Sequence, residues 1–468
     1  MSLKKILFCA ICLLGAPAFT FSSVPIMERM ERLDASRHFD LVQNGKPGFD
    51  IVLPKESRSQ TGAAAEELAD LLRQACAAEI RISTEKSPGK TAIMLGELAL
   101  QEEFGRNCSA FDRDGFVILS KPGVIVIAGR DEPEGASDRE QGTLFGVYEF
   151  LERFAGFRFY FPGKLGTIVP RLENWRLPHM QIQERPDFMV RNIYWWAGVD
   201  GQKPGWYDQD LPMKENMRLQ WRRLKLESRY LPCCHGLAYL DVETRFAESH
   251  PEYFALTDNG QRRNQGGPGH LGSHLCFSSA VKDEIYKDAL ALFSGKPASA
   301  RGIKAWRSGQ KRPFFDLWPN DGLFMCKCEN CRQYTDSKAI SEFMWGFACD
   351  IAERLKQNQV PGYVTFPSYN PFGDIPTRDI PDNVLVVKAL GGPYVYHQDK
   401  LHKRDKQKIV DWHNKLGRKI WIWNYAHKLH GPAGIPNMIP NAIAAYYKDV
   451  KDYVFGALME SESDVWLS

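Results

Sequence analysis

The sequence has little net charge. Its 60 lysine and arginine residues nearly balance 57 aspartate and glutamate residues, so the formal net charge is +3 over 468 residues. A nucleic-acid-binding protein needs a strongly basic surface to hold phosphates, so this balance argues against that class. The chain also lacks internal repeats and low-complexity tracts, which excludes solenoid architectures and argues against extended disorder.

Several common functional motifs are absent as well. There is no P-loop, no glycine-rich dinucleotide fingerprint and no His-Glu-x-x-His pair, so we expect no nucleotide cofactor and no metalloprotease chemistry. The only hydrophobic run that resembles a targeting segment is 6–14, and it is too short to span a bilayer. We therefore expect that this protein binds no nucleic acid and has no membrane-spanning segment.

The N-terminus is typical of an exported protein. Lys4 and Lys5 precede the apolar run, and Ala16-Pro17-Ala18 forms a small-x-small cleavage site. This order predicts a signal peptide over 1–18 and a secreted or periplasmic location. The alternative is an uncleaved starting helix.

Two domains are expected from the pattern that follows. Over 45–170, short apolar strands (49–53, 92–96, 115–119, 124–128) and two helices, one opening at Thr61 and one over 143–154, give the order β-α-β-β-β-α of a small α/β sandwich. Pro162, Pro170, Pro178 and Pro186 then punctuate a stretch without periodicity, which predicts a linker.

The second domain, 185–468, alternates strands and helices at the rhythm of a (β/α)8 TIM-type barrel. The expected strands are 189–194, 229–233, 314–318, 363–366, 384–389, 419–423 and 453–458. A closed barrel of this class needs eight strands, so the prediction is a barrel that is truncated before strand eight.

Particular segments carry a family resemblance. The segments 141–152 (QGTLFGVYEFLE) and 156–163 (GFRFYFPG) resemble the end of the accessory domain that precedes the barrel in family 20 hexosaminidases and α-glucuronidases. The segments 250–256 (HPEYFAL), 275–279 (LCFSS) and 318–322 (WPNDG), with Cys326-x-Cys328-x-x-Cys331, resemble domain-of-unknown-function family 4838. That family overlaps glycoside hydrolase family 163, so the resemblance implies an endo-β-N-acetylglucosaminidase acting on N-glycans.

Two carboxylates are the candidate catalytic groups. In a TIM barrel the reacting groups lie at the carboxyl ends of the strands. Asp321 follows the third expected strand, and Glu460, with Glu462 beside it, follows the seventh. If the substrate carries a 2-acetamido group, its own carbonyl can act as the nucleophile. We therefore expect Glu460 to be the general acid and Asp321 to orient the amide, or the reverse. The alternatives are an Asx turn at Asp321 and a solvated acidic loop at Glu462.

Other strand ends offer substrate-binding side chains. Trp423 and Tyr425 share a face of the sixth strand, where they form either a stacking wall for a sugar or part of the barrel core. A lone histidine such as His235 is more often structural than ligand-binding. The full set of predicted substrate-binding residues is His235, Asn320, Tyr369, Lys388, Trp423 and Tyr425.

The loop after the third strand is rich in cysteine. Cys326, Cys328 and Cys331 either bind a structural zinc ion, with Cys276 or a nearby histidine as the fourth ligand, or form a disulfide with one thiol left over. We expect no metal at the catalytic site. A cysteine nucleophile is not expected, because no partner histidine is evident.

The sequence thus predicts a glycoside hydrolase with a glycan substrate. One rival is another glycosidase specificity, such as an α-glucuronidase, for which Lys388 would be the strand-end cation that binds the uronate. A second rival is a non-catalytic exported glycan-binding protein, because fold alone does not establish chemistry.

Overall fold

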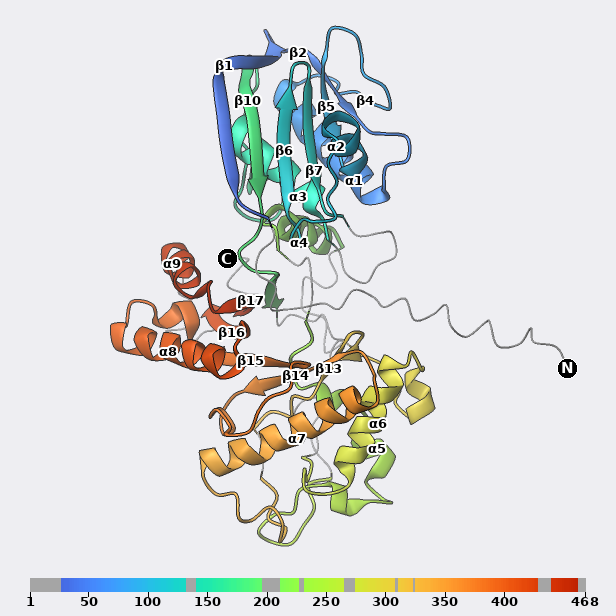
Figure 1. Cartoon of the computed structure of the whole chain (residues 1–468), viewed down its shortest axis with the longest axis vertical. Helices are drawn as coiled ribbons and strands as arrows, with labels where there is room; N and C mark the ends of the chain where they lie inside the picture. The colour runs from blue at the N-terminus through green and yellow to red at the C-terminus, as the bar shows by residue number, and fades with distance from the viewer. Residues whose placement is uncertain are drawn as a thin grey trace, which may run out of the picture.

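The computed structural model describes residues 27–131, 140–195, 211–226, 231–264, 274–307, 310–322, 325–427 and 439–461. The protein is a mixed α/β molecule with an N-terminal sheet domain at one end and a C-terminal barrel-like region at the other (Figure 1). The predicted signal peptide lies outside the described residues.

The N-terminal domain is built on one mixed sheet. Its eight described strands lie in the order β2-β1-β10-β6-β7-β5-β3-β4. Neighbours from β2 to β7 pair antiparallel, and those from β7 to β4 pair parallel. The strands are β1 (Met30–Gln43), β2 (Lys46–Pro47), β3 (Phe49–Val52), β4 (Ile82–Ser83), β5 (Thr91–Leu95), β6 (Phe116–Lys121), β7 (Val124–Gly129) and β10 (Trp175–Glu184).

Helices cover both faces of this sheet because its central strands are apolar on both sides. Ile93 and Ile127 face α1 (Ser59–Cys76) and α3 (Gly142–Phe150), whereas Met94 and Val126 face α2 (Glu97–Phe104). Fully buried parallel strands read as continuous hydrophobic runs, and the expected strands 92–96 and 124–128 are such runs. A π-helical turn (Leu151–Ala155) continues α3, and the short pair β8 (Arg158–Phe159) and β9 (Thr167–Ile168) follows.

The segment expected to be a linker contains a long strand. β10 pairs with β1 along most of its length and with β6 on its other side. The expectation failed because Pro178 was taken as a breaker. Its partner across the strands is His38, at a register shift between Asp34 and His38, which is where a sheet tolerates a missing N–H donor.

The C-terminal region is a curled, mostly parallel sheet. The order is β11-β17-β16-β15-β14-β13-β12, and only β12 runs antiparallel to its neighbour. The strands are β11 (Val190–Trp195), β12 (Gln310–Lys311), β13 (Phe314–Asp316), β14 (Tyr363–Ser368), β15 (Val384–Leu390), β16 (Ile420–His427) and β17 (Val454–Ser461). The first strand, β11, is hydrogen-bonded directly to the last, β17.

Alternate residues of these strands face the interior of the curl or the helices outside it. On β15, Leu385 and Val387 join the interior cluster, and Val384 and Val386 pack toward the helix layer. Helices flank the strands on the outer side (Figure 1). The helices are α4 (Leu211–Arg223), α5 (Val242–Phe246), α6 (Val281–Phe293), α7 (Ser337–Gln357), α8 (Asp399–Leu416) and α9 (Pro440–Val450), with short 3-10 turns at Gly236–Tyr239, Pro251–Tyr253, Ala298–Arg301 and Gly392–Val395.

The strand expected over 229–233 is not a strand in its described part. Leu231 and Cys233 are buried in the interior cluster, as a barrel strand would be, but they join no ladder. Pro232 lacks the N–H that a central strand must donate. The N–H groups of Cys234 and Gly236 bond to the side chain of Asp316 instead.

Ion pairs join the two regions. Arg191 on β11 lies 2.7 Å from the buried carboxylate of Asp114, and Arg223 on α4 lies 2.9 Å from Glu67. The carbonyl of Phe159 also accepts a hydrogen bond from Gln220. Because these groups are largely shielded from water, the contacts hold the N-terminal domain against the start of the barrel-like region more firmly than exposed pairs would.

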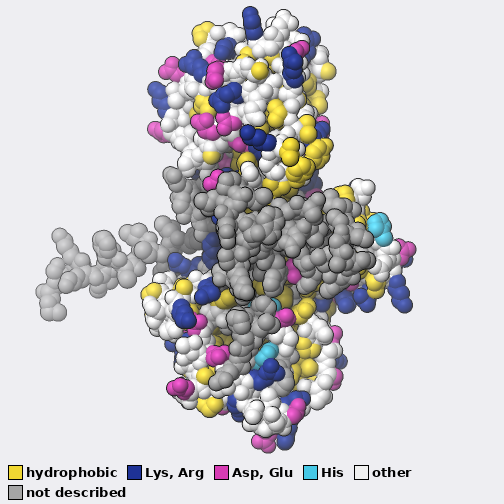
Figure 2. Space-filling view, turned by 180° about the vertical axis from the view of Figure 1, so that it is seen from behind, with side chains coloured by type: hydrophobic (Ala, Val, Ile, Leu, Met, Phe, Trp, Pro, Cys, Tyr) yellow, Lys and Arg dark blue, Asp and Glu magenta, His cyan; other side chains and the backbone are white. Residues whose placement is uncertain are grey.

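The described surface agrees with the balanced charge. On the face of the N-terminal domain that Figure 2 draws, acidic and basic side chains are interspersed, with no broad field of one sign. In the part of the chain that the structure describes, no helix combines the length and the hydrophobicity that crossing a bilayer requires.

Candidate functional site

The carboxyl ends of the parallel strands gather aromatic and acidic side chains. Glu460, near the end of β17, is only 5% exposed, and its Oε2 accepts a hydrogen bond of 2.8 Å from Nε1 of Trp423 on the adjacent strand β16. The indole therefore fixes the orientation of the carboxyl group. This pairing arises because parallel neighbours deliver their carboxyl ends to the same edge.

Trp423 belongs to an aromatic group with Trp318, which follows β13. The two indoles meet edge to face, with centroids 5.3 Å apart. Trp318 also contacts Tyr369, at the end of β14, and the ring of His235 at centroid distances of 5.9 and 5.5 Å. Three strands and the loop through His235 thus contribute to one wall of aromatic rings beside Glu460, in which Trp318 and Trp423 are each 5% exposed and packed in the interior cluster.

His235 is held by its own backbone and by a carbonyl. It adopts a left-handed conformation with φ of 48°, and its Nδ1 lies 2.6 Å from the carbonyl oxygen of Pro319. This contact makes Nδ1 the protonated nitrogen of the neutral ring, since the carbonyl can only accept. The turn that carries Asp321 is thereby tied to the turn that carries His235.

Asp321 lies in an exposed turn after β13. Its Oδ1 accepts a hydrogen bond of 2.9 Å from the N–H of Gly322, while Asn320 beside it is half-buried. This contact reaches only the next residue, whereas the Asx turn that was the alternative for Asp321 would bond the N–H two residues on, and the carboxylate stays exposed. The local geometry is therefore compatible with a carboxylate presented at the strand ends and equally with a plain turn.

Tyr425 lies near Trp423, toward the end of β16. Burial raises the pKa of its phenol, and the negative charge of Glu460 raises it further. Tyr425 is half-buried and packs with the interior cluster, as Tyr369 does.

Lys388 is not brought together with the other predicted residues. It alternates with the inward-facing Leu385 and Val387 and so points toward the helix layer. Its Nζ donates to the carbonyl and hydroxyl oxygens of Ser368 at 3.1 and 3.0 Å, and burial lowers its pKa to about 8. The same Ser368 hydroxyl accepts from Trp412 on α8.

A functional residue that sequence reasoning missed is Asp316, at the end of β13. It is fully buried and accepts hydrogen bonds from the N–H groups of Cys234, Gly236 and Trp318 and from the hydroxyl of Thr365. Burial raises the pKa of Asp316 to about 7, and the backbone hydrogen bonds act against that rise.

Asp316 is a positioning residue: it fixes the turn through His235 and the start of the segment that carries Trp318. The signal in the sequence was a lone acidic residue inside the apolar run Phe314-Phe315-Asp316-Leu317-Trp318. Buried charges are rare unless they are hydrogen-bonded. Glu462 lies outside the described residues.

The protein is of the mixed α/β class, with a parallel, barrel-like sheet that carries carboxylates and aromatic rings at its carboxyl edge. Residues 161–464 match the family model described as Domain of unknown function (DUF4838), and the chain belongs to this family. No curated protein matches the sequence.

Three solved structures illustrate the similarity to glycoside hydrolases. One is described as a novel family GH115 4-O-methyl-α-glucuronidase, BtGH115A, with specificity for decorated arabinogalactans: 15% identity, 90% of this chain and 54% of that chain covered, TM-score 0.49. The second is CpGH84B, with 13% identity and a TM-score of 0.34; the match covers 95% of this chain and 68% of that chain. The third is a GH138 enzyme described as targeting pectin rhamnogalacturonan II, with 12% identity and a TM-score of 0.34; the match covers 89% of this chain and 47% of that chain. The chain spans about half the length of the first of these proteins.

Proposed function

We propose that this protein is an exported glycoside hydrolase that cleaves a glycan bearing a 2-acetamido sugar, as an endo-β-N-acetylglucosaminidase does. The observation that carries the proposal is the buried carboxyl group of Glu460, oriented by Trp423 beside a wall of aromatic rings. Glycosidic cleavage needs a positioned carboxyl group to protonate the leaving oxygen, and aromatic rings bind the sugar next to it.

In the proposed mechanism, the acetamido carbonyl of the substrate attacks the anomeric carbon while Glu460 donates its proton to the departing glycosidic oxygen. Asp321 accepts a hydrogen bond from the acetamido N–H and so directs the carbonyl toward the anomeric carbon. Water then opens the cyclic intermediate, with Glu460 as the base, and the configuration is retained.

The test compares two amide variants. Glu460→Gln and Asp321→Asn should each lower the hydrolysis of N-glycan oligosaccharides by at least about 100-fold, the lower end of the usual contribution of acid–base groups, while glycan binding persists. Glu353→Gln and Asp452→Asn change exposed carboxylates on α7 and before β17 and are the matched controls.

Leaving-group chemistry separates the two roles. An aryl glycoside leaves as a stabilised phenolate and needs little protonation, so it should restore much of the rate of Glu460→Gln but not that of Asp321→Asn. Normal rates in both variants would refute the assignment. A wild-type protein that turns over no glycan, yet gains melting temperature with ligand, would instead be a binding protein.

The α-glucuronidase alternative gains no support from the strand ends that the structure describes. Lys388, the cation that the sequence offered for a uronate, bonds to Ser368 on the helix side of the sheet.

A further inference from the structure

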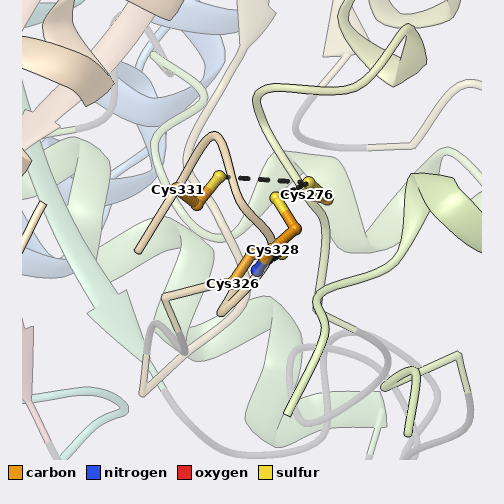
Figure 3. Close-up of side chains that lie close together, drawn as sticks. All are labelled: Cys276, Cys326, Cys328 and Cys331. Atoms are coloured by element: carbon orange, nitrogen blue, oxygen red, sulfur yellow. Dashed lines mark hydrogen bonds between the residues drawn. The ribbon is translucent and has the colours of Figure 1, made fainter. Parts of the chain in front are cut away.

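Four cysteine side chains converge at one point apart from the strand-end site. The Sγ atoms of Cys276, Cys326, Cys328 and Cys331 all lie within 4.8 Å of one another. Cys276 comes from the segment before α6, and the other three come from the loop between β13 and α7, which lies beside that segment (Figure 3).

The distances between the sulfur atoms identify the kind of site. Cys276 Sγ lies 3.7 Å from Cys328 Sγ and 4.0 Å from Cys331 Sγ. A disulfide requires about 2.05 Å. Four sulfur atoms at the corners of a tetrahedron, each about 2.3 Å from a central zinc ion, are about 3.8 Å apart. The observed separations therefore match a metal tetrahedron.

The backbone around the cluster holds the ligand segments in place without a metal ion. The N–H of Cys276 donates to the carbonyl of Tyr253, and Phe254 and Leu275 form an antiparallel bridge. The N–H of Lys327 donates to the carbonyl of Leu256. Because these bonds join the two cysteine-bearing segments to a common strand-like piece of chain, the thiols are preorganised.

Hydrogen-bond donors surround the sulfur atoms. Cys326 Sγ accepts from the N–H groups of Leu256 and Cys328 at 3.2 and 3.4 Å. The hydroxyl of Ser278 lies 3.3 Å from Cys276 Sγ, and its oxygen accepts a hydrogen bond of 3.1 Å from the Cys331 thiol. Donors aimed at sulfur stabilise thiolates and tune metal sites.

We propose that these four cysteines bind one zinc ion as thiolates in a closed, structural site. Cys276, Cys326 and Cys331 are buried and Cys328 is half-buried, so four protein ligands fill the coordination sphere and leave no position for a reacting water. Binding releases the thiol protons and needs no oxidant or reductant.

The zinc ion would stabilise the conformation of the cysteine loop and would take no part in the catalytic reaction. The cysteine loop begins shortly after Asp321 and ends at the N-cap of α7, where Asp336 accepts from the N–H of Ala339. A zinc ion there joins this loop to the segment before α6 and so limits the conformations open to the turn at Asp321.

Metal analysis of the full chain tests the proposal. Protein purified without chelators or metal-affinity resin should contain one zinc ion per chain, and cobalt exchanged into it should give the intense visible absorption of tetrahedral cobalt thiolates. Cys331→Ser should lower the zinc content to well below half. Cys349→Ser, which alters an equally buried thiol of α7, should leave it unchanged.

The zinc content and the cobalt absorption spectrum of the wild type test the proposal even if Cys331→Ser fails to fold. A chain that contains no zinc and shows two of these four cysteines oxidised to a disulfide would overturn the proposal. Iron in place of zinc would overturn the choice of metal, because a four-thiolate tetrahedron also suits iron.

Discussion

The indole Nε1 of Trp423 donates a hydrogen bond of 2.8 Å to Oε2 of Glu460, and the two residues come from neighbouring parallel strands. This contact joins the aromatic wall to the candidate acid. It also makes the orientation of Glu460 depend on a residue that sequence reasoning assigned only to sugar stacking or to the core.

Trp423→Phe should keep a ring in place but remove the donor. A hydrogen bond between neutral groups contributes about 0.5–1.5 kcal/mol, which corresponds to roughly a 2- to 10-fold loss of kcat/KM. Steady-state hydrolysis of the glycan measures this loss. Trp306→Phe removes an indole hydrogen bond to the Lys296 carbonyl elsewhere and should leave the rate unchanged. Equal rates for both variants would show that the contact does not orient an acting group.

Asp316→Asn should destabilise the fold by about 1–3 kcal/mol, because an amide cannot accept all the donors that now bond to the two carboxyl oxygens. The folded-state pKa of Asp316 is about 7, above its ordinary value of 3.8. Its contribution to stability is therefore full below pH 3.8 and is lost as the pH rises through 7. The variant should thus gain stability relative to the wild type between about pH 4.5 and about pH 7.5.

Urea unfolding at those two pH values measures the difference. A gap between wild type and Asp316→Asn that widens with rising pH would mean that the backbone donors, and not burial, decide the ionisation of Asp316.

Gly236→Ala should weaken the turn through His235. A Cβ at this position would lie 2.4 Å from Cβ of Asp316 and 2.5 Å from its carbonyl oxygen, so the backbone must move, at a cost of about 1–3 kcal/mol. Gly62→Ala is the control within α1, where the new methyl group meets nothing within 4 Å, and it should be neutral or stabilising. Thermal unfolding compares the two. Similar melting temperatures would contradict the close packing of Gly236 on Asp316.

Lys388→Met should leave hydrolysis intact, because the amine bonds to Ser368 on the helix side of the sheet. Its folded-state pKa of about 8 is below 10.5, so the wild type gains stability as the pH rises from 8 to 10.5, and the variant should lack this gain. Denaturation at about pH 7.5 and about pH 10 measures the slope. A large loss of activity toward uronate-bearing glycans alone would return Lys388 to the binding site.

The parallel part of the fold was predictable because its signals are local. The strands expected at 384–389 and 453–458 correspond to β15 and β17, and the helix expected to open at Thr61 corresponds to α1. Each is a buried apolar run or a periodic face that needs no knowledge of its partner. β1 was missed because most of its side chains are half-buried or exposed, and its existence depends on pairing with β10.

From the sequence, the candidate site could be predicted only as a set of residues that lie at the ends of strands. Position along the chain placed Glu460 and Trp423 near one edge, but it did not reveal the hydrogen bond between them. Asp316 was missed because its role is to accept hydrogen bonds from a segment that lies far away in the sequence. For the cysteines, spacing identified three thiols and left the fourth ligand open between Cys276 and a nearby histidine, and the folded chain brings Cys276 to them.

The pairing of β11 with β17 has a consequence for how the chain is made. Val190 on β11 pairs with Gly456 on β17. The ribosome therefore synthesises β11 long before its partner strand β17. Until then β11 presents unsatisfied N–H and C=O groups, which invite pairing with other chains. Assembly of the C-terminal region must therefore wait until β17 has been synthesised, and it should proceed slowly, as contacts between distant residues require.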